Sequence, residues 1–318
     1  MSSTSKQSSN QKPGAQNSEF NASENHRAGF ASFVGRPNVG KSTLTNALVG
    51  EKIAITSSKP QTTRRAIRGV VHRPFGQLVL VDTPGLHRPR TLLGERLNNL
   101  VESTLSDVDV IGFCIPANEK IGVGDTFINA SLDQFRGAKL VAVVTKSELV
   151  DRKSLAEQLL AVQALRDWAA IIPVSAVEGD QLEDLVKVLV ELMPVSPALY
   201  PTEWVTDESN EQRICELIRE AALEGVRDEL PHSLAVTIDE MNPREGRNMI
   251  DIHANIFVER DSQKGIILGH KGSRLRDVGT RARLEIETLL GSKVYLNLHV
   301  KVAQDWQRDP KQLGKLGF

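Results

Sequence analysis

Nine residues near the amino-terminal end have the composition and spacing of a loop that binds phosphate groups. The first eight match G-x-x-x-x-G-K-[ST], in which the glycines let main-chain N–H groups approach phosphates closely. The lysine reaches the β- and γ-phosphates, and the hydroxyl residue binds Mg²⁺. The competing interpretation is a glycine turn with a surface lysine, which the apolar segment before the loop and the helical spacing after it disfavour. The nine candidate nucleotide ligands are Gly35, Arg36, Pro37, Asn38, Val39, Gly40, Lys41, Ser42 and Thr43.

A second cluster lies about 40 residues further on, where Asp82, Thr83, Pro84 and Gly85 follow the apolar segment 77–81. In enzymes with a phosphate loop, an acidic residue at a strand end holds the Mg²⁺ shell. The main-chain N–H of Gly85 would meet the γ-phosphate. Alone, these four residues indicate only a turn, but their position after the phosphate loop makes them the second half of a nucleotide site.

Two more clusters end apolar segments later in the chain. Thr145, Lys146 and Glu148 follow residues 140–144, and Ser175 and Ala176 follow the segment 169–174. A carboxylate at 148 would accept hydrogen bonds from N1 and N2 of guanine, the stem of Lys146 would pack on the base, and an N–H at 175–176 would meet guanine O6. The carboxyl ends of parallel strands are where such sheets bind ligands.

The elements that position these clusters alternate between apolar strands and helical patterns, which predicts an α/β fold with a mostly parallel sheet and helices on both faces. We expect strands at 29–34, 77–81, 110–115, 140–144 and 169–174, and helices from 41 and over 95–105, 154–168 and 182–192. Three prolines in residues 194–209 indicate a linker. The predicted division is a disordered tail at 1–27, an α/β domain at 28–195, a linker at 196–209 and a second domain at 210–318.

The second domain has a different pattern and a different motif. Helical spacing over 210–224 precedes strand patterns at 233–240 and 249–258, and a long helix to about 290 precedes a strand at 293–302. Between them, Gly269, His270, Lys271 and Gly272 match GXXG, the loop with which KH domains clamp a nucleic-acid backbone. The motif alone is weak, but its place among these elements predicts an α+β fold of the type II KH class.

Positive charge surrounds this motif. Between 264 and 283 six basic residues stand against one acid, Asp277. An ordinary solvated helix face is the alternative interpretation. Residues 266–268 would line a base-binding groove or belong to the core, and Trp306 would either stack on a base or pack internally. The predicted RNA ligands are Lys264, Gly269, His270, Lys271, Gly272, Arg274 and Arg281, of which Lys271, Arg274 and Arg281 share a helical face.

Composition narrows the class of protein. The 318 residues carry a net charge of −1, so a nucleic-acid surface must be a local patch. Two cysteines without metal-ligand spacing predict reduced thiols and no zinc or disulfide framework. No apolar run approaches a membrane span, and the polar first 27 residues have neither a signal-peptide pattern nor the acid-poor composition of a transit peptide.

The order of these motifs resembles the translation-factor class of GTPases and, more narrowly, the Era family of bacterial ribosome-assembly GTPases. The resemblance covers residues 29–318 and rests on GRPNVGKST at 35–43, QTTR at 61–64, DTPGL at 82–86 and GHKG at 269–272. It implies a P-loop GTPase domain followed by a type II KH domain. It also implies GTP hydrolysis, binding of the 3′ end of 16S rRNA, assistance to small ribosomal subunit assembly, and a location in the bacterial cytoplasm, in part at the inner membrane surface. No DNA partner is expected.

The resemblance also assigns roles to residues. Lys41, Thr63, Asp82 and Gly85 would be catalytic, Ser42 and Thr63 (with Thr62 as the less favoured candidate) would bind Mg²⁺ in the GTP state, and Asn38 would help to hold K⁺ beside the phosphates. Residues 57–65 and those from 85 to about 95 would be ordered by GTP and released after hydrolysis.

Two departures from related GTPases set further expectations. Leu86 stands where Ras-like GTPases have a glutamine that orients water, which predicts slow intrinsic hydrolysis. The guanine motif N-K-x-D is TKSE here. Thr145 lacks the amide that braces the loop, and Glu148 has one methylene more than aspartate, so guanine selectivity should survive but weaken. Complete loss of the charge-assisted bidentate pair would cost about 2–3 kcal/mol. The alternatives are a GTPase whose second domain binds protein or membrane, an ATPase, and a nucleotide-binding scaffold with little turnover.

Overall fold

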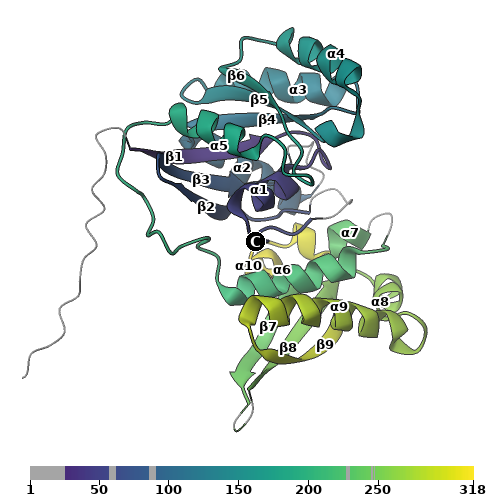
Figure 1. Cartoon of the computed structure of the whole chain (residues 1–318). Helices are drawn as coiled ribbons and strands as arrows, with labels where there is room; N and C mark the ends of the chain where they lie inside the picture. Colours follow the sequence, from purple (N-terminus) through teal and green to yellow (C-terminus); the bar gives the residue numbers. More distant parts are fainter. Residues whose placement is uncertain (1–25, 57–61, 86–90, 227–229, 245, 247) are drawn as a thin grey trace, which may run out of the picture.

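The computed structural model describes residues 26–56, 62–85, 91–226, 230–244, 246 and 248–318. Within these ranges the strands form two separate sheets, one in each part of the chain (Figure 1). The first sheet has the strand order β2-β3-β1-β4-β5-β6, in which β2 is antiparallel to β3 and the other neighbours are parallel. Its strands are β1 (Arg27–Val34), β2 (Ile67–Arg73), β3 (Gly76–Asp82), β4 (Val110–Pro116), β5 (Lys139–Thr145) and β6 (Ala170–Pro173).

Helices cover both faces of this sheet. The apolar sides of α1 and α5 pack on one face, and those of α2, α3 and α4 pack on the other. Strands β3 and β4 are buried along their whole length, which explains their continuous apolar sequences. Burial in this core raises the pKa of the Cys114 thiol to about 12. The helices are α1 (Lys41–Val49), α2 (Leu92–Asp107), α3 (Val123–Ser131), α4 (Arg152–Gln163) and α5 (Leu182–Glu191).

Two elements of this part were not expected from the sequence. Strand β2 lies at the edge of the sheet and carries Arg68 and Arg73, which pair with Asp207 and Glu183. Helix α3 buries only Asp125 and Ile128, so its sequence lacks a full apolar stripe. An edge strand and a peripheral helix need little apolar surface, and their sequences therefore give weak periodic signals.

The segment expected to be a linker lies against the sheet. The main-chain N–H of Val70 donates to the oxygen of Val205 at 2.8 Å, next to a β-bridge between Gly69 and Thr206. The buried side chain of Gln77 accepts from the main-chain N–H of Tyr200 at 2.9 Å and donates to its oxygen at 2.8 Å. Hydrogen bonds thus fix this segment along β2 and β3.

The second sheet has the order β7-β8-β9, with β7 and β8 antiparallel and β8 and β9 parallel. Helices α6 and α9 pack their apolar sides on the sheet. The element order agrees with the type II KH class predicted from the sequence. The elements are α6 (Asn210–Leu223), α7 (Leu230–Ser233), β7 (Ala235–Pro243), β8 (Met249–Val258), α8 (Asp261–Leu268), α9 (Ser273–Leu290), β9 (Lys293–Val302) and α10 (Pro310–Lys315).

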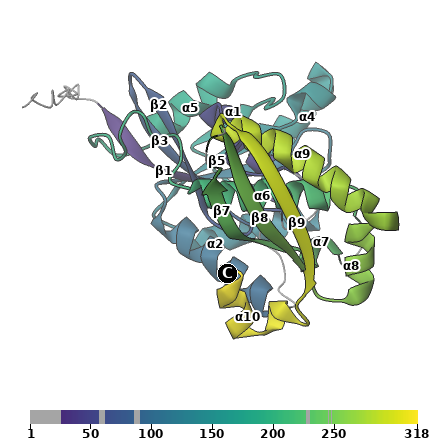
Figure 2. The same cartoon turned by 90° about the horizontal axis from the view of Figure 1, so that it is seen from below.

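A smaller apolar cluster joins the two parts. Leu93 and Leu97 of α2 pack against Trp306, Leu313 and residues near the end of the chain. Figure 2 shows α10 beside α2, viewed from below. The helix that follows the Asp82–Gly85 cluster is therefore in contact with the second domain. In the part of the chain described, no helix combines the length and apolar character that a membrane crossing requires.

Candidate nucleotide and RNA sites

The phosphate loop connects β1 to α1, and its glycines are required by geometry. Gly35 has a φ of +154°, and a Cβ there would lie 2.6 Å from the main-chain oxygen of Cys114. Gly40, which precedes the first turn of α1, has a φ of +101°. Larger side chains would strain both positions. The loop can therefore turn its main chain toward a ligand at the start of α1, where the helix favours anions.

Lys41 lies across this loop. Its Nζ donates to the main-chain oxygens of Gly35 and Arg36, both at 3.0 Å, and burial lowers the pKa of its amine. A Cβ added to Gly85 would lie 3.5 Å from the same Nζ. The second cluster thus lies directly against the phosphate loop, as the sequence predicted.

Three oxygen-bearing side chains meet beside the loop. The hydroxyls of Ser42 and Thr63 each donate to Oδ2 of Asp82 at 2.9 Å and lie 3.1 Å from each other. These residues come from α1, from the segment before β2, and from the end of β3. Of the two threonines considered for this role, Thr63 is the one whose hydroxyl reaches Asp82.

This group fits a Mg²⁺ ion. Asp82 is 1% exposed, and its Oδ1 has no hydrogen-bond partner among the described residues. Burial raises the pKa of this carboxyl, against the opposing effect of Ser42, Thr63 and Lys41. Carboxylate and hydroxyl oxygens are ligands that Mg²⁺ accepts, and a cation would satisfy the unpaired oxygen.

The guanine cluster lies close to the phosphate loop. The Thr145 hydroxyl donates to the main-chain oxygen of Val39 at 2.6 Å, so a brace exists where the sequence had suggested its loss. Lys146 has a left-handed φ of +58°, and Oε2 of Glu148 is buried without a partner among the described residues. An unpaired buried carboxylate oxygen suits a ligand with N–H donors.

Three more of the predicted nucleotide ligands have a structural partner or a defined conformation, whereas the buried hydroxyl of Thr83 has no partner among the described residues. Arg36 pairs with Asp125 of α3 at 2.8 Å and with Glu119, which precedes that helix, at 2.9 Å, so its side chain anchors the loop. Asn38 has a φ of +65°, and Ser175 is buried just after β6. The N–H of Glu178 donates to the Ser175 hydroxyl at 3.0 Å, which shapes the turn beside Ala176. Residues 57–61 and Leu86 lie outside the described residues.

The GXXG loop has the backbone conformation that its glycines permit. Gly269 and Gly272 have φ values of +69° and +75°, and Lys271 is also left-handed at +50°. A Cβ on Gly269 would lie 2.7 Å from Cβ of Arg274. His270 and Lys271 are exposed at the tip, and Lys264 is half-buried on α8. The loop presents a tight turn with exposed basic side chains.

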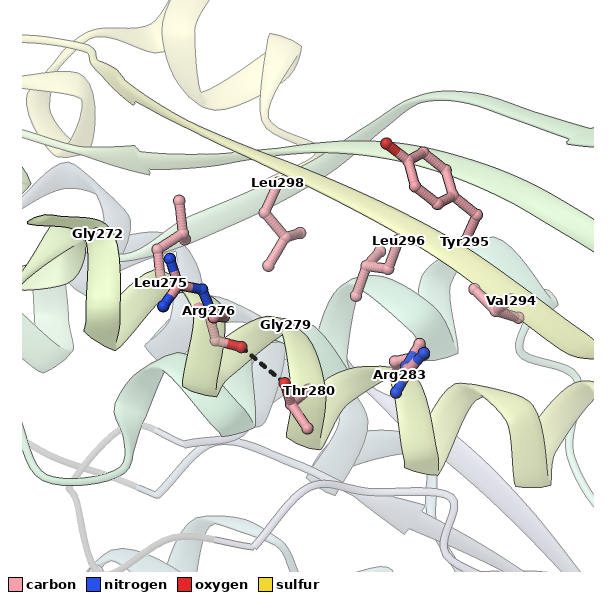
Figure 3. Close-up of a pocket in the computed structure, with 10 residues that line it drawn as sticks. All are labelled: Gly272, Leu275, Arg276, Gly279, Thr280, Arg283, Val294, Tyr295, Leu296 and Leu298. Carbon is pink, nitrogen blue, oxygen red and sulfur yellow. Dashed lines mark hydrogen bonds between the residues drawn. The ribbon is translucent and has the colours of Figure 1, made fainter.

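A groove of about 490 Å³ extends from Gly272 between α9 and β9 (Figure 3). Leu296 and Leu298 point from β9 toward the helix, and Arg276 and Arg283 flank the opening. Both arginines are among the six basic residues between 264 and 283, but neither was among the predicted RNA ligands. Their separation by seven residues, with Gly279 and Thr280 between them, is the signal that could have placed them on one face of α9.

Arg274 and Arg281, which were predicted to bind RNA, lie elsewhere. Arg274 donates to the main-chain oxygen of Glu224 at 2.6 Å, and Arg281 forms an ion pair with the Glu224 side chain. The two arginines are also seven residues apart, but they face the end of α6 and not the groove. Their role in RNA binding stays a prediction, because helical periodicity alone does not tell which face of a helix has a packing partner.

Burial assigns Ile267 and Trp306 to the interior and leaves Ile266 at the surface. Ile267 is fully buried in the core of the second domain, whereas Ile266 is exposed. Trp306 is fully buried, stacks on Phe318 with ring centres 5.5 Å apart and donates from its indole to the oxygen of Ser233 at 3.1 Å. Trp306 therefore packs internally and has no surface for a base.

The fold and the two sites define a GTPase of the P-loop class with a carboxyl-terminal KH domain. A family model described as 50S ribosome-binding GTPase matches residues 30–146, and a KH domain model matches residues 229–307. The chain is 62% identical to GTPase Era of Streptomyces coelicolor over 312 residues, which cover 95% of this chain and 98% of the relative. With GTPase Era of Mycolicibacterium smegmatis it shares 62% identity over 298 residues, 92% of this chain and 99% of the relative.

Solved structures of Era proteins are also similar to this chain. A variant of Aquifex aeolicus Era bound to GDP and AlF₄⁻ matches with a TM-score of 0.88 and 35% identity, covering 92% of this chain and 99% of that one. An Era complex with MgGDPNP and nucleotides 1506–1542 of 16S rRNA also gives a TM-score of 0.88, with 36% identity and the same coverage. The chain belongs to the Era family of GTPases. It is an enzyme that hydrolyses GTP, and this disfavours the ATPase and scaffold alternatives.

Proposed function

We propose that this GTPase binds the 3′ end of 16S rRNA through its KH domain and assists small ribosomal subunit assembly. The groove between α9 and β9, continuous with the GXXG loop, carries the proposal. An Era protein with the same fold has been solved with an RNA of this region. Leu275, Leu296 and Leu298 would contact unstacked bases, and Arg276 and Arg283 would contact phosphates.

The test replaces the exposed residues of the loop tip. His270→Asp with Lys271→Asp should abolish binding of a labelled RNA of nucleotides 1506–1542, because two like charges would face the phosphate backbone. Nucleotide affinity serves as the control. Unchanged RNA binding would instead support the alternative of a second domain that recognises protein or membrane.

In the nucleotide site we propose that each of the three clusters has one task. Lys41 would stabilise charge on the β- and γ-phosphates, and the N–H of Gly85 would donate to the γ-phosphate. Ser42 and Thr63 would hold Mg²⁺ with the support of Asp82, and the ion would neutralise charge on the phosphate oxygens. Lys146, Glu148, Ser175 and Ala176 would recognise guanine. Leu86 has no group that could orient water, and we therefore keep the expectation of slow intrinsic hydrolysis.

We further propose that Asn38 takes part in a K⁺ site beside the phosphates. Its main chain already has the left-handed conformation that turns the loop, at a φ of +65°. The monovalent ion would supply positive charge of the kind that an arginine finger supplies elsewhere. Hydrolysis should then be faster in K⁺ than in Na⁺, and Asn38→Ala should remove the difference.

The contact between α2 and the second domain supports coupling between nucleotide and RNA. If GTP orders residues 57–65 and the start of α2, it changes surfaces that the KH domain touches. Linkage then requires RNA to change the affinity for GTP by the same factor. Equal RNA affinity with GDP and with a GTP analogue would rule this coupling out.

The division of the chain remains part of the proposal. We assign residues 28–195 to the GTPase domain, 196–209 to a connecting segment and 210–318 to the KH domain. The tail expected at 1–27 was drawn too long, because Arg27 begins β1 and the buried His26 is hydrogen-bonded to the main-chain oxygen of Ser196. The proposed location is the bacterial cytoplasm. Peripheral contact with the inner membrane would use the basic GXXG surface, and RNA should compete with vesicles for it.

A further inference from the structure

The threonine at the Mg²⁺ group has both of its chain neighbours bound to the second domain. Thr63 faces Asp82 and Ser42, as described above. The main-chain oxygen of Thr62 accepts a hydrogen bond from Arg219 of α6. On the other side, Arg64 donates to main-chain oxygens of α7 and of Leu234, which follows it.

Arg219 is placed for this contact. Its side chain is 2% exposed, and Glu216, one turn earlier on α6, holds the guanidinium through Nε at 3.0 Å and Nη2 at 2.5 Å. A paired and buried guanidinium has a fixed direction. The direction of the N–H group that donates to Thr62 is therefore fixed within the KH domain, and does not depend on the segment that contains Thr62.

Arg64 is enclosed more completely. It donates to the main-chain oxygens of Leu234 at 2.5 Å, Pro231 at 2.9 Å and His232 at 2.8 Å. Its guanidinium also lies 5.9 Å from the ring centre of Trp306 and 5.8 Å from that of Phe318. Burial lowers the pKa of Arg64 to about 9, so the group stays protonated at neutral pH.

We propose that Arg219 is a positioning residue for the GTPase reaction, acting from the KH domain to hold Thr63 on the Mg²⁺ group, with Arg64 as the second anchor. The proposal rests on the proposed role of Thr63. Two fixed points on either side of one residue remove most of the main-chain freedom that would otherwise carry its hydroxyl away from Asp82. Displacement of a ligand by about 1 Å can cost about a hundredfold in rate.

The test compares Arg219→Gln with Arg213→Gln in the full chain. Arg213 is a matched control, because it also reaches from α6 to the GTPase domain, where it donates to the oxygen of Lys52 at 3.3 Å. We expect Arg219→Gln to reduce single-turnover hydrolysis by about tenfold or more and to raise the Mg²⁺ concentration for half-maximal rate. GDP affinity without Mg²⁺ and RNA affinity should change less than about twofold, and Arg213→Gln should leave all four quantities unchanged.

A double-mutant cycle with Thr63→Ala separates this proposal from the one on which it rests. If Arg219 acts through Thr63, Arg219→Gln should have no further effect on rate or Mg²⁺ dependence in the Thr63→Ala background. Equal effects in both backgrounds, or an unchanged Mg²⁺ dependence of Arg219→Gln, would overturn the positioning role. If Thr63→Ala itself changes neither quantity, the proposed role of Thr63 fails instead. Should Arg219→Gln fold poorly, Arg219→Lys, which keeps the charge beside Glu216, should show a smaller loss in the same cycle.

Discussion

The hydroxyl of Thr145 donates a hydrogen bond to the main-chain oxygen of Val39 at 2.6 Å, and this bond joins the guanine loop to the phosphate loop. Thr145 ends β5, whereas Val39 lies between the two glycines of the phosphate loop, and both residues are buried. The two halves of the nucleotide site are thereby held at a fixed separation. Threonine thus performs the bracing task that asparagine performs in the N-K-x-D motif.

Thr145→Val should weaken GTP and GDP binding alike. Valine keeps the shape of the side chain but removes the donor, at a cost of about 1 kcal/mol or about fivefold in affinity. Thr145→Asn is the control, because its amide supplies a donor again. Displacement of a fluorescent GDP measures both variants. Affinities of Thr145→Val within twofold of the parent protein would show that the bond does not support the site.

Glu148→Gln should remove guanine selectivity, because a carboxamide oxygen cannot replace a carboxylate that receives two donors. The buried Oε2 of Glu148 has no partner among the described residues, so this oxygen can accept a hydrogen bond from the guanine base. Loss of this charged pair should cost about 2–3 kcal/mol for GTP and nothing for ATP. Competition of GTP and ATP for a fluorescent nucleotide measures the ratio.

Glu148→Asp tests the geometry of the same pair. The family pattern has aspartate here, and we expect the shorter side chain to strengthen GTP binding relative to ATP. If ATP competes equally with GTP in the parent protein and in both variants, Glu148 does not read guanine, and the base pocket must be sought elsewhere.

Much of the site could be predicted because each motif follows a buried strand. Asp82 ends β3, Thr145 ends β5 and Ser175 follows β6, and parallel strands bring these ends to one edge of the sheet. The elements that could not be predicted bury little apolar surface, so their sequences show no hydrophobic periodicity. The edge strand β2 and the thinly buried α3 are examples.

The orientation of charged side chains was also beyond the sequence. Arg274 and Arg276 differ by two positions on one helix, yet the first meets α6 and the second flanks the groove. The hydrogen bonds from Arg219 to Thr62 and from Arg64 to Leu234 join residues more than 150 positions apart. The orientation of a charged side chain depends on such long-range packing, which local sequence patterns do not reveal.

Asp82→Asn should stabilise the nucleotide-free protein while abolishing Mg²⁺-dependent hydrolysis. Burial raises the pKa of Asp82, so over an interval of pH the folded protein holds a proton that the unfolded chain has lost. The free energy of unfolding therefore falls as pH rises through that interval. Asparagine cannot ionise, and the melting temperature in EDTA should be higher at neutral pH and less dependent on pH.

The same Asp82→Asn protein should hydrolyse GTP at least about a hundredfold more slowly at saturating Mg²⁺, since the support of Ser42 and Thr63 is altered and a charge is lost. Thermal scans between pH 4 and 8 and phosphate release check the two effects. A lower melting temperature together with normal turnover would contradict both the burial argument and the role of Asp82.

Arg276→Ala with Arg283→Ala should weaken RNA binding, whereas Arg274 and Arg281 should matter less for it. The first pair flanks the groove beside α9, and the second pair contacts Glu224. Each phosphate contact to single-stranded RNA contributes about 0.7 to the slope of log affinity against log salt, so the double variant should lower that slope by about 1.4. Arg281→Ala is the matched control on the same helix and should leave the slope unchanged. A salt titration of RNA binding decides between the two faces: loss of slope in Arg281→Ala, with none in the double variant, would place the RNA on the α6 side of α9.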